Sequence, residues 1–497
     1  MTLEAPWLLL GMRFGLDGTT RVFLALTVVL WLVAAVYAYG YVRERRGHFA
    51  AFFAATFAGN LGLVLAADAA SFYLFFSLMT FAGYGLVVHQ RDEPARRAAR
   101  IYLVLAVIGE ALLLGGLILA GSAAQSLEPA ALRAAVAADA RRDLIVLLLF
   151  AGFGVKAGAL GLHVWLPLAH PVAPTPASAV LSGAMIKAGV LGWLQFLPLG
   201  EAALPGWGAG IAALGIAGAF YAAAVGVAQD DPKTVLAYSS VSQMGFMMTA
   251  LGAGLAVPAA APGAAAAAAY YALHHGLAKG ALFLGVGIAP RGPLGLLLLG
   301  LPALALAGMP FTSGAAAKHA MKDILGDWPA AATLLSFAAV GTTLLMARFL
   351  VLMARAEAHA SRLATAAWVA AVAVSLAAAS LATMPGFSFA DVWPVLAGAG
   401  IAAAFAAAGG RLRRLRVPAG DLVVPLAAGA RLGLRALEQA AEGLGTGAQR
   451  AFAWTAHRWH RLVERSTAAS QAGERRLRAA GPAAALLVIA LLLLSGW

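Results

Sequence analysis

The sequence contains no cysteine and few charged residues. Only 11% of its 497 residues are Asp, Glu, Lys or Arg, whereas about 25% is usual in a soluble protein. The absence of cysteine excludes disulfides, thiolate metal sites and cysteine-ligated iron–sulfur clusters. No G-x-G-x-x-G motif joins a strand to a helix and no histidine pair suits haem, so we expect no cofactor. Met1 to Gly11 has no basic n-region, so we expect no cleavable signal peptide.

Apolar residues dominate the chain. Hydrophobic residues make up 62% of it, and the mean hydropathy is +0.84. Apolar runs of about twenty residues recur from end to end, and each can cross a hydrocarbon core of about 30 Å. We therefore predict an all-α polytopic membrane protein with about 14 transmembrane helices. The expected segments are 22–41, 48–67, 69–89, 101–121, 144–168, 176–199, 207–229, 235–256, 263–289, 293–324, 329–353, 363–384, 391–409 and 482–497.

The arginines indicate how these segments are oriented. One set follows the first, third, ninth, eleventh and thirteenth segments, so all of these loops lie on one side of the membrane, which the positive-inside rule makes the cytoplasm. The residues concerned are Arg43, Arg45, Arg46, Arg91, Arg96, Arg97, Arg100, Arg291, Arg355, Arg362, Arg411, Arg413, Arg414 and Arg416. Arg133, Arg141 and Arg142 fall on the opposite side, in a longer loop that also carries Glu128, Asp139 and Asp143. The N-terminus is then outside. The formal net charge of +13 reflects these loops, and we expect no nucleic-acid partner.

Residues 411–481 differ from the rest of the chain. They are rich in arginine, and their apolar residues are spaced rather than continuous, as in Leu432, Leu437 and Leu444. This pattern indicates an amphipathic helix in the membrane interface; the alternative is a cytoplasmic helical linker. We divide the chain into a transmembrane domain (1–410), this basic amphipathic region (411–481) and a C-terminal transmembrane anchor (482–497).

Lysines are rare, and their positions are unusual. The chain has 29 arginines but only six lysines. Four of the lysines lie inside predicted membrane segments: Lys156, Lys187, Lys279 and Lys318. A charge there costs about 3 kcal/mol or more, so such residues face a polar interior and mark ion pathways. Lysine can lose its proton when it is buried, whereas arginine stays charged. The four lysines therefore predict a proton relay.

Other ionisable residues accompany the lysines. Glu110 lies inside the fourth segment, and His275 lies one helical turn before Lys279. His163, His274 and His319 are secondary candidates, because an intramembrane histidine can also serve as a hydrogen-bonding contact between helices. We expect no metal site, since His274 and His275 are adjacent, point in different directions and have no cluster of carboxylates near them in the sequence.

Helix-breaking residues occur beside two of the lysines. Trp165-Leu166-Pro167 ends the fifth segment, and Gly308-Met309-Pro310 interrupts the tenth just before Lys318. Broken membrane helices are tolerated where they line a cavity and are typical of transporters. The two segments are five apart, an odd number, so they run in opposite directions. An inverted repeat of five helices would give this arrangement.

Four motifs resemble those of a known family. They are His170-Pro171-Val172-Ala173-Pro174-Thr175-Pro176 with Ser178 to Lys187, then Asp231 to Ser240, Ser242-Gln243-Met244-Gly245, and His275 to Leu284. Over about residues 16–410 the chain resembles the antiporter-like proton-pumping subunits of respiratory complex I, membrane-bound hydrogenases and Mrp-type cation/proton antiporters. The resemblance implies two inverted five-helix repeats, segments two to six and seven to eleven, and a lateral helix within 411–481. It also implies relay roles for Lys156, Lys187, Lys279, Lys318 and Glu110.

The chain departs from this family in two places. The family carries a Trp-Glu-Leu-Met-type motif whose glutamate pairs with the first lysine, but here the run is Phe76-Ser77-Leu78-Met79. Either Glu110 takes over the pairing with Lys156, or the first half-channel is altered or silent. The second departure is at the N-terminus, where the chain begins just before Leu16-Asp17-Gly18. We expect the two helices that usually precede this point to be absent or supplied by a partner.

The expected function follows from the relay and the resemblance. We expect a proton-translocating subunit of a multi-subunit energy-coupling complex in the bacterial inner membrane, together with other membrane subunits and a soluble energy-coupling subunit. No redox active site is visible in this chain, so the energy would come from another subunit or an ion gradient. The alternatives are a subunit of a cation/proton antiporter, a subunit of a proton-driven inorganic-carbon uptake complex, and a largely structural membrane scaffold.

Overall fold

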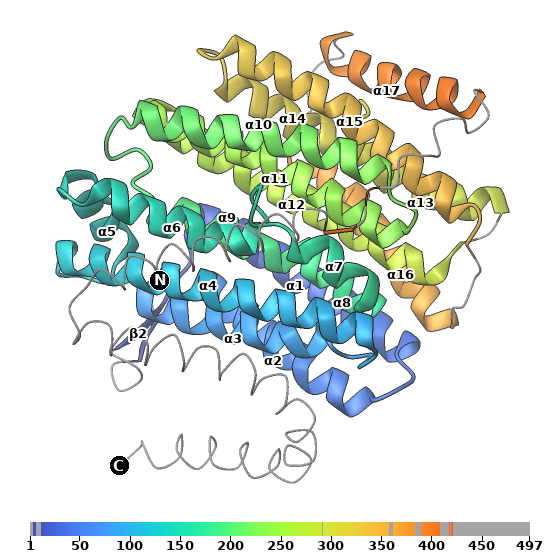
Figure 1. Cartoon of the computed structure of the whole chain (residues 1–497), viewed down its shortest axis with the longest axis horizontal. Helices are drawn as coiled ribbons and strands as arrows, with labels where there is room; N and C mark the ends of the chain where they lie inside the picture. The colour runs from blue at the N-terminus through green and yellow to red at the C-terminus, as the bar shows by residue number, and fades with distance from the viewer. Residues whose placement is uncertain are drawn as a thin grey trace, which may run out of the picture. The chain divides into compact units, whose positions relative to one another are not determined.

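The computed structural model describes residues 3–5, 11–290, 292–356, 361–382, 389–407, 417 and 419–420. These residues belong to one compact unit, residues 1–421. Its helices lie side by side in a bundle, with α2 to α4 on one side, α10 and α15 on the other, and α11 and α12 between them (Figure 1). Most of the predicted region 411–481 and all of the predicted anchor 482–497 lie outside the described residues.

The described elements are helical apart from a short antiparallel pair of strands, β1 (Leu3–Ala5) and β2 (Met12–Phe14). The helices are α1 Gly18–Tyr41, α2 Arg46–Leu65, α3 Ala69–Val87, α4 Glu93–Ala124, α5 Pro129–Ala138, α6 Arg142–Ala157, α7 Trp165–Val172, α8 Thr175–Val180, the π-helix η1 Leu181–Met185, α9 Ile186–Phe196, α10 Pro205–Val227, α11 Pro232–Ala256, the 3-10 helix η2 Pro258–Ala260, α12 Ala261–Ile288, α13 Gly292–Ala307, α14 Ser313–Ile324, α15 Pro329–Met353, α16 Arg362–Ala377, the 3-10 helix η3 Ala378–Leu381 and α17 Phe389–Ala407.

Nine helices in the described part are long and apolar enough to cross a membrane. Two more, α11 and α12, have the length but carry Ser, Gln, His and Lys side chains, and most of their residues are buried by the other helices. Polar groups in a bilayer are stable only where protein surrounds them, which explains why these two helices are central.

Helix boundaries follow local sequence signals. Asp17, Asp68, Asp92 and Asp231 each accept a hydrogen bond from a backbone N–H in the first turn of the following helix, as helix N-caps do. Between α10 and α11, paired glycines allow close packing: a Cβ added to Gly245 would lie 2.2 Å from the carbonyl oxygen of its opposite residue on α10. Small residues bring membrane helices together in this way.

Two membrane segments are interrupted. The chain leaves helical structure after α6 and resumes at α7, with Gly158 and Gly161 at positive φ in between. It also breaks between α13 and α14, as Pro310 predicts. In the first case the break lies before Trp165 rather than at Pro167, because the left-handed glycines end the helix upstream of the prolines.

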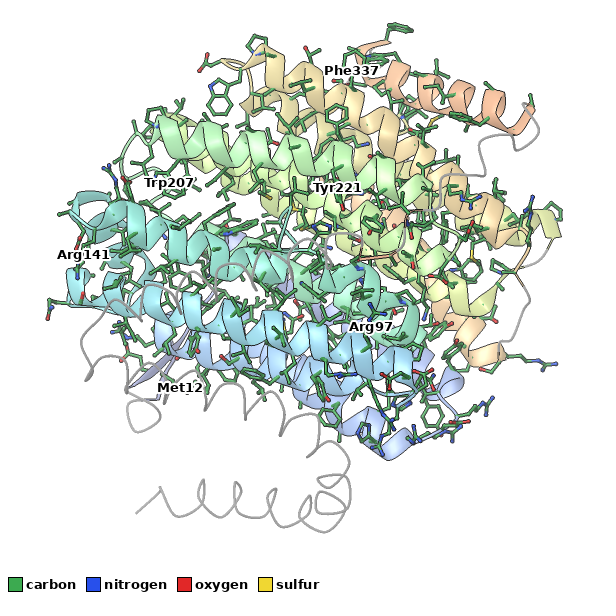
Figure 2. All side chains as sticks on the ribbon, in the orientation of Figure 1. Met12, Arg97, Arg141, Trp207, Tyr221 and Phe337 are labelled. Atoms are coloured by element: carbon green, nitrogen blue, oxygen red, sulfur yellow. The ribbon has the colours of Figure 1, made fainter. Side chains whose placement is uncertain are left out.

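The arginines mark the two ends of the bundle. Arg97, near the start of α4, and Arg141, just before α6, lie at opposite ends of the bundle (Figure 2). At the end of the bundle that carries Arg141, α5 forms a short helix that was not among the expected segments. It is not a membrane span, and it buries only Leu132 and Val136.

Candidate functional site

Lys156 lies in the last turn of α6, next to the break. It is 4% exposed, and its Nζ donates a hydrogen bond of 3.2 Å to the hydroxyl of Tyr102 on α4. The rings of Phe76, Tyr102 and Trp165 surround the ammonium group, with centroids 5.8, 5.1 and 5.7 Å from Nζ. Aromatic faces attract a cation, so these rings replace part of the solvation that Lys156 loses on burial.

Glu110 on α4 is also buried, and it faces Ser77. The Ser77 hydroxyl donates to Glu110 Oε2 at 2.7 Å. Glu110 and Lys156 attract each other electrostatically but form no direct ion pair. Position 77 therefore holds the buried carboxylate of Glu110 in place instead of supplying a carboxylate of its own.

Lys187 lies in the first turn of α9, the helix that follows the π-helical turn η1. Its Nζ donates to the backbone carbonyl of Ser182, which lies within η1. A π-helical turn shifts the backbone hydrogen-bond pattern from i→i+4 to i→i+5, and such turns occur frequently at functional sites. Here the turn presents a carbonyl oxygen to a buried cation.

A line of hydrogen bonds joins the surroundings of Lys187 to Lys279. The hydroxyls of Ser182 and Ser240 lie 2.7 Å apart, and the Ser240 hydroxyl donates to the carbonyl of Leu236 at 3.0 Å. Lys279 Nζ donates to that same carbonyl at 2.8 Å. The two lysines also repel each other electrostatically, so a charge on one opposes a charge on the other.

Histidines lie between Lys279 and the second broken helix. His275 is fully buried within electrostatic range of Lys187 and Lys279. His274 Nδ1 and the hydroxyl of Ser313, the first residue of α14, are 2.8 Å apart. An imidazole ring can donate a hydrogen bond from one nitrogen and accept one at the other, so these residues can connect groups on either side of them.

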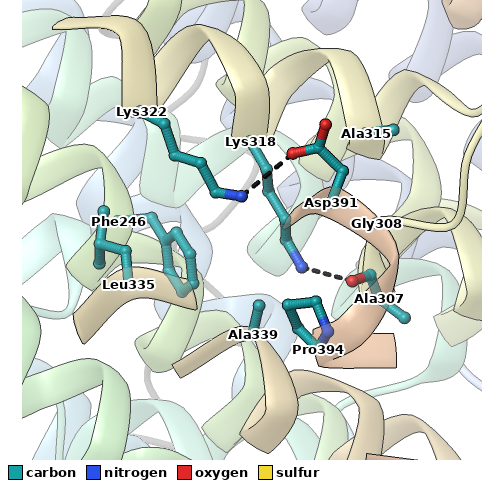
Figure 3. A pocket seen from close by; sticks show the side chains of 10 residues that line it. All are labelled: Phe246, Ala307, Gly308, Ala315, Lys318, Lys322, Leu335, Ala339, Asp391 and Pro394. Atoms are coloured by element: carbon teal, nitrogen blue, oxygen red, sulfur yellow. Dashed lines mark hydrogen bonds and ion pairs between the residues drawn. The ribbon is translucent and has the colours of Figure 1, made fainter. Parts of the chain in front are cut away.

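Lys318 is the last lysine of the buried series. It is 8% exposed, and its Nζ donates a 2.7 Å hydrogen bond to the carbonyl of Ala307, the last residue of α13 (Figure 3). That carbonyl is available because the helix stops at the break. Gly308 has a φ of +93°, and a Cβ there would lie 2.9 Å from the Lys318 side chain, so the break is shaped to accommodate the lysine.

The structure places the predicted relay residues inside one bundle, and all but His319 are buried. Lys156, Lys187, Lys279, Lys318, Glu110, His163, His274 and His275 are all buried. His319 is different: its side chain is 43% exposed and lies 3.5 Å from Asp323. The relay role of each residue stays a prediction.

Sequence reasoning missed the polar groups that join these residues. Tyr102, Ser182, Ser240 and Ser313 carry the hydrogen bonds, and His170 is fully buried against the ring of Phe283, with centroids 4.6 Å apart. Ser182, Ser240 and His170 lie within the family-like motifs, and this location was the only sequence feature that could have pointed to them. Hydroxyl groups are common inside membrane helices, and nothing local distinguishes a bridging one.

The buried lysines share one property. None of Lys156, Lys187, Lys279 and Lys318 forms an ion pair with a carboxylate in the described part of the chain, and their hydrogen bonds go to carbonyls or a hydroxyl. The described residues also contain no group of His, Cys, Asp and Glu able to hold a metal ion. The arrangement can hold each lysine as an ammonium or as an amine, because a neutral amine can donate the same hydrogen bond.

These features define a polytopic membrane protein with a buried series of titratable cations beside two broken helices. The profile of the family described as "NADH:quinone oxidoreductase/Mrp antiporter, TM" matches residues 66–346. The chain belongs to this family.

Individual relatives agree with that assignment. The chain is 30% identical over 294 residues to hydrogenase-4 component B of Escherichia coli, covering 57% of this chain and 44% of the relative. It is 32% identical over 253 residues to Na(+)/H(+) antiporter subunit A1 of Staphylococcus haemolyticus, covering 49% and 31%. The chain thus spans less than half the length of these relatives. A solved Mrp complex from Dietzia sp. shares the fold, with a TM-score of 0.75, 23% identity, and coverage of 89% of this chain and 54% of that one.

Proposed function

We propose that this chain translocates protons along its buried lysines as a membrane subunit of a multi-subunit energy-coupling complex. The observation that carries the proposal is the hydrogen bonding of the lysines to neutral acceptors only. A buried ammonium paired with a carboxylate is held charged, because breaking such a pair costs about 3–5 kcal/mol. Lysines without carboxylate partners can change charge state as protons pass.

In this proposal the proton passes along an ordered series. Lys156, with Glu110 as its distant counter-charge, exchanges with Lys187. The hydroxyls of Ser182 and Ser240 lie between Lys187 and Lys279, whose ammonium groups are held by the carbonyls of Ser182 and Leu236. His275, His274 and Ser313 continue the series to Lys318. Since charges on neighbouring lysines repel, arrival of a proton at one favours its departure from the next.

The finer architecture belongs to the same proposal. We infer 14 transmembrane helices in all, with two inverted five-helix repeats in which α6–α7 and α13–α14 are the corresponding broken helices. Residues 1–410 would form the channel domain, 411–481 the lateral helix and 482–497 a last span. We place the protein in a bacterial inner membrane with further membrane subunits and a soluble energy-coupling subunit.

One alternative has support from the relatives. Several relatives are named as Na(+)/H(+) antiporter subunits, so exchange of a metal cation for protons is the second candidate. The two functions differ in one measurable respect: only the antiporter dissipates an imposed pH gradient when Na⁺ or K⁺ is added.

The experiment uses the full chain in proteoliposomes with an imposed pH gradient and a fluorescent pH probe. Lys279→Met removes the titratable group, and Lys279→Arg keeps a positive charge that cannot release its proton. Both variants are expected to lose proton flux, while Arg97→Met, at an exposed arginine, retains it. Wild-type flux in both Lys279 variants would disprove the proposed function. Cation-triggered dissipation of the gradient would establish the antiporter alternative.

A further inference from the structure

An acidic side chain lies just beyond the last buried lysine. Asp391, in the first turn of α17, reaches α14, where its Oδ1 lies 3.1 Å from Lys322 Nζ. Lys318 and Lys322 are one turn apart on α14, so their side chains leave the same face of the helix. Lys318, Lys322 and Asp391 line one cavity of about 20 Å³ (Figure 3), which is room for about one water molecule.

Asp391 also faces a second titratable group. Its Oδ2 lies 3.9 Å from His319 Nδ1, and His319 Nε2 lies 3.5 Å from Asp323 Oδ2. Side-chain exposure rises along this line, from 15% at Asp391 to 43% at His319 and 64% at Asp323. The cluster therefore connects a buried position to the surface.

The surface end of the cluster is a wide hollow. His319 and Asp323 line a depression of about 870 Å³, together with residues at the first turn of α1, including Gly18 and Thr19. This end of α1 lies opposite the arginine-rich loops that follow Tyr41. The hollow therefore opens on the side that the positive-inside rule makes the outside.

A purely structural reading of the ion pair is that it fastens α17 to α14. That reading accounts for the contact between Lys322 and Asp391, but it gives no reason for the other two features. Asp391 shares a cavity with Lys318, and its second oxygen faces an imidazole that leads to solvent. A carboxylate placed between a buried amine and an exposed imidazole can pass a proton from one to the other.

We propose that Asp391 is the proton-transfer residue at the outer end of the series, that Lys322 positions it, and that His319 and Asp323 connect it to the outward hollow. The inference rests on the proposed proton translocation. In the outward step an N–H bond of the Lys318 ammonium breaks and an O–H bond forms on the Asp391 carboxylate, directly or through one water that gives up one proton as it gains another. Lys318 is left as a neutral amine.

The second step restores the Asp391 carboxylate, and the next proton that arrives along the series restores the Lys318 ammonium. The O–H bond of the Asp391 acid breaks, a ring nitrogen of His319 takes the proton, and the proton then leaves to solvent beside Asp323. While Lys322 is paired with Asp391, its positive charge stabilises the carboxylate and opposes protonation. Opening of the pair therefore permits transfer and closing ends it. Asp391 lies beyond residue 346, where the family match ends, so the shared motifs do not specify this outer end.

The test compares two substitutions of Asp391 in the full chain, reconstituted in proteoliposomes with an imposed pH gradient. Asp391→Asn retains an oxygen acceptor for Lys322 but cannot carry the proton, and its flux is expected to fall by about a hundredfold, as on loss of a general acid–base group. Asp391→Glu keeps the carboxylate and is expected to stay within about tenfold of wild type. Glu93→Gln, in an exposed ion pair with Arg100, is the matched control.

The outcomes separate a proton-transfer role from a structural one. Wild-type flux in Asp391→Asn overturns the inference, and so does flux in Asp391→Glu as low as in Asp391→Asn, because a structural contact would explain that result. If Asp391→Asn does not reach the membrane, the exchange of charges in Lys322→Asp with Asp391→Lys keeps both the pair and a carboxylate near Lys318. Loss of flux in this folded double variant would also contradict the inference. Lys279→Met tests the proposed function independently of these variants.

Discussion

The charge on Lys156 depends on a carboxylate that does not touch it. Glu110 is held by the Ser77 hydroxyl at 2.7 Å, and no carboxylate oxygen of Glu110 lies within 4.0 Å of Lys156 Nζ. Two unit charges 4 Å apart attract by about 4 kcal/mol at an effective dielectric constant near 20. The attraction between Glu110 and Lys156 is therefore weaker than about 4 kcal/mol. Glu110→Gln removes it and keeps a side chain that can bond to Ser77.

We expect Glu110→Gln to slow proton flux without unfolding the protein. Loss of up to about 4 kcal/mol disfavours the Lys156 ammonium by as much as about a thousandfold. If every proton passes Lys156, flux falls by between about tenfold and a thousandfold. The assay is the initial rate of pH-gradient dissipation in proteoliposomes, with the amount of folded protein checked by gel filtration. Glu93→Gln, at the exposed start of the same helix, is the control.

Two results would refute this reasoning. Wild-type flux in Glu110→Gln, combined with loss of flux in Lys156→Met, would show that Lys156 needs no counter-charge from Glu110. Wild-type flux in Lys156→Met would show that the first part of the series is silent. The double change Ser77→Glu with Glu110→Gln moves the carboxylate to position 77, and it is expected to recover part of the flux that Glu110→Gln loses.

Three further predictions concern packing, pH and hydrogen bonding. Gly245→Ala places a methyl group 2.2 Å from a backbone oxygen of α10, so it is expected to destabilise the protein by about 1–3 kcal/mol; its thermal midpoint should fall, whereas that of Gly210→Ala, with open space around it, should not. Burial, with His48 and Arg45 nearby, lowers the pKa of His89 in the loop after α3. The folded state therefore disfavours protonated His89, and stability, complete above the ordinary pKa of about 6.5, declines as the pH falls below it; a thermal midpoint that drops equally in His89→Phe would contradict this. Tyr102→Phe keeps the ring beside Lys156 but removes its hydrogen bonds to Lys156 and to the Thr80 carbonyl, at a cost of about 1–3 kcal/mol; a thermal midpoint and flux equal to wild type would show that the hydroxyl is dispensable.

The helices and the buried lysines were predictable because each depends on a strong local signal. A run of about twenty apolar residues has no favourable alternative to a membrane span, so α1, α10 and α15 lie close to the expected segments. Lysine inside such a run is costly enough to imply a polar interior, and Lys187 and Lys279 are fully enclosed. The break near Pro310 follows in the same way from a residue that cannot continue a helix.

Contacts between distant parts of the chain were not predictable from local signals. The Ser182–Ser240 contact joins residues 58 apart in sequence, and the Lys322–Asp391 hydrogen bond joins residues 69 apart. Each of these contacts depends on which faces of two helices meet. A helix that is apolar on every side has no sequence periodicity that reveals its contact face. The first break also lay upstream of the expected prolines, because left-handed glycines ended α6.

The distribution of acidic side chains indicates that the ends and the middle of the lysine series have different roles. Glu110 lies near Lys156 at one end, and Asp391 lies beyond Lys318 at the other. Between them the described polar groups that contact the lysines are hydroxyls and carbonyls, accompanied by imidazoles. A carboxylate next to Lys279 would hold it charged, since a buried ion pair is costly to break. Carboxylates at the ends can capture or release protons, whereas an interior without them leaves Lys187 and Lys279 controlled by each other's charge.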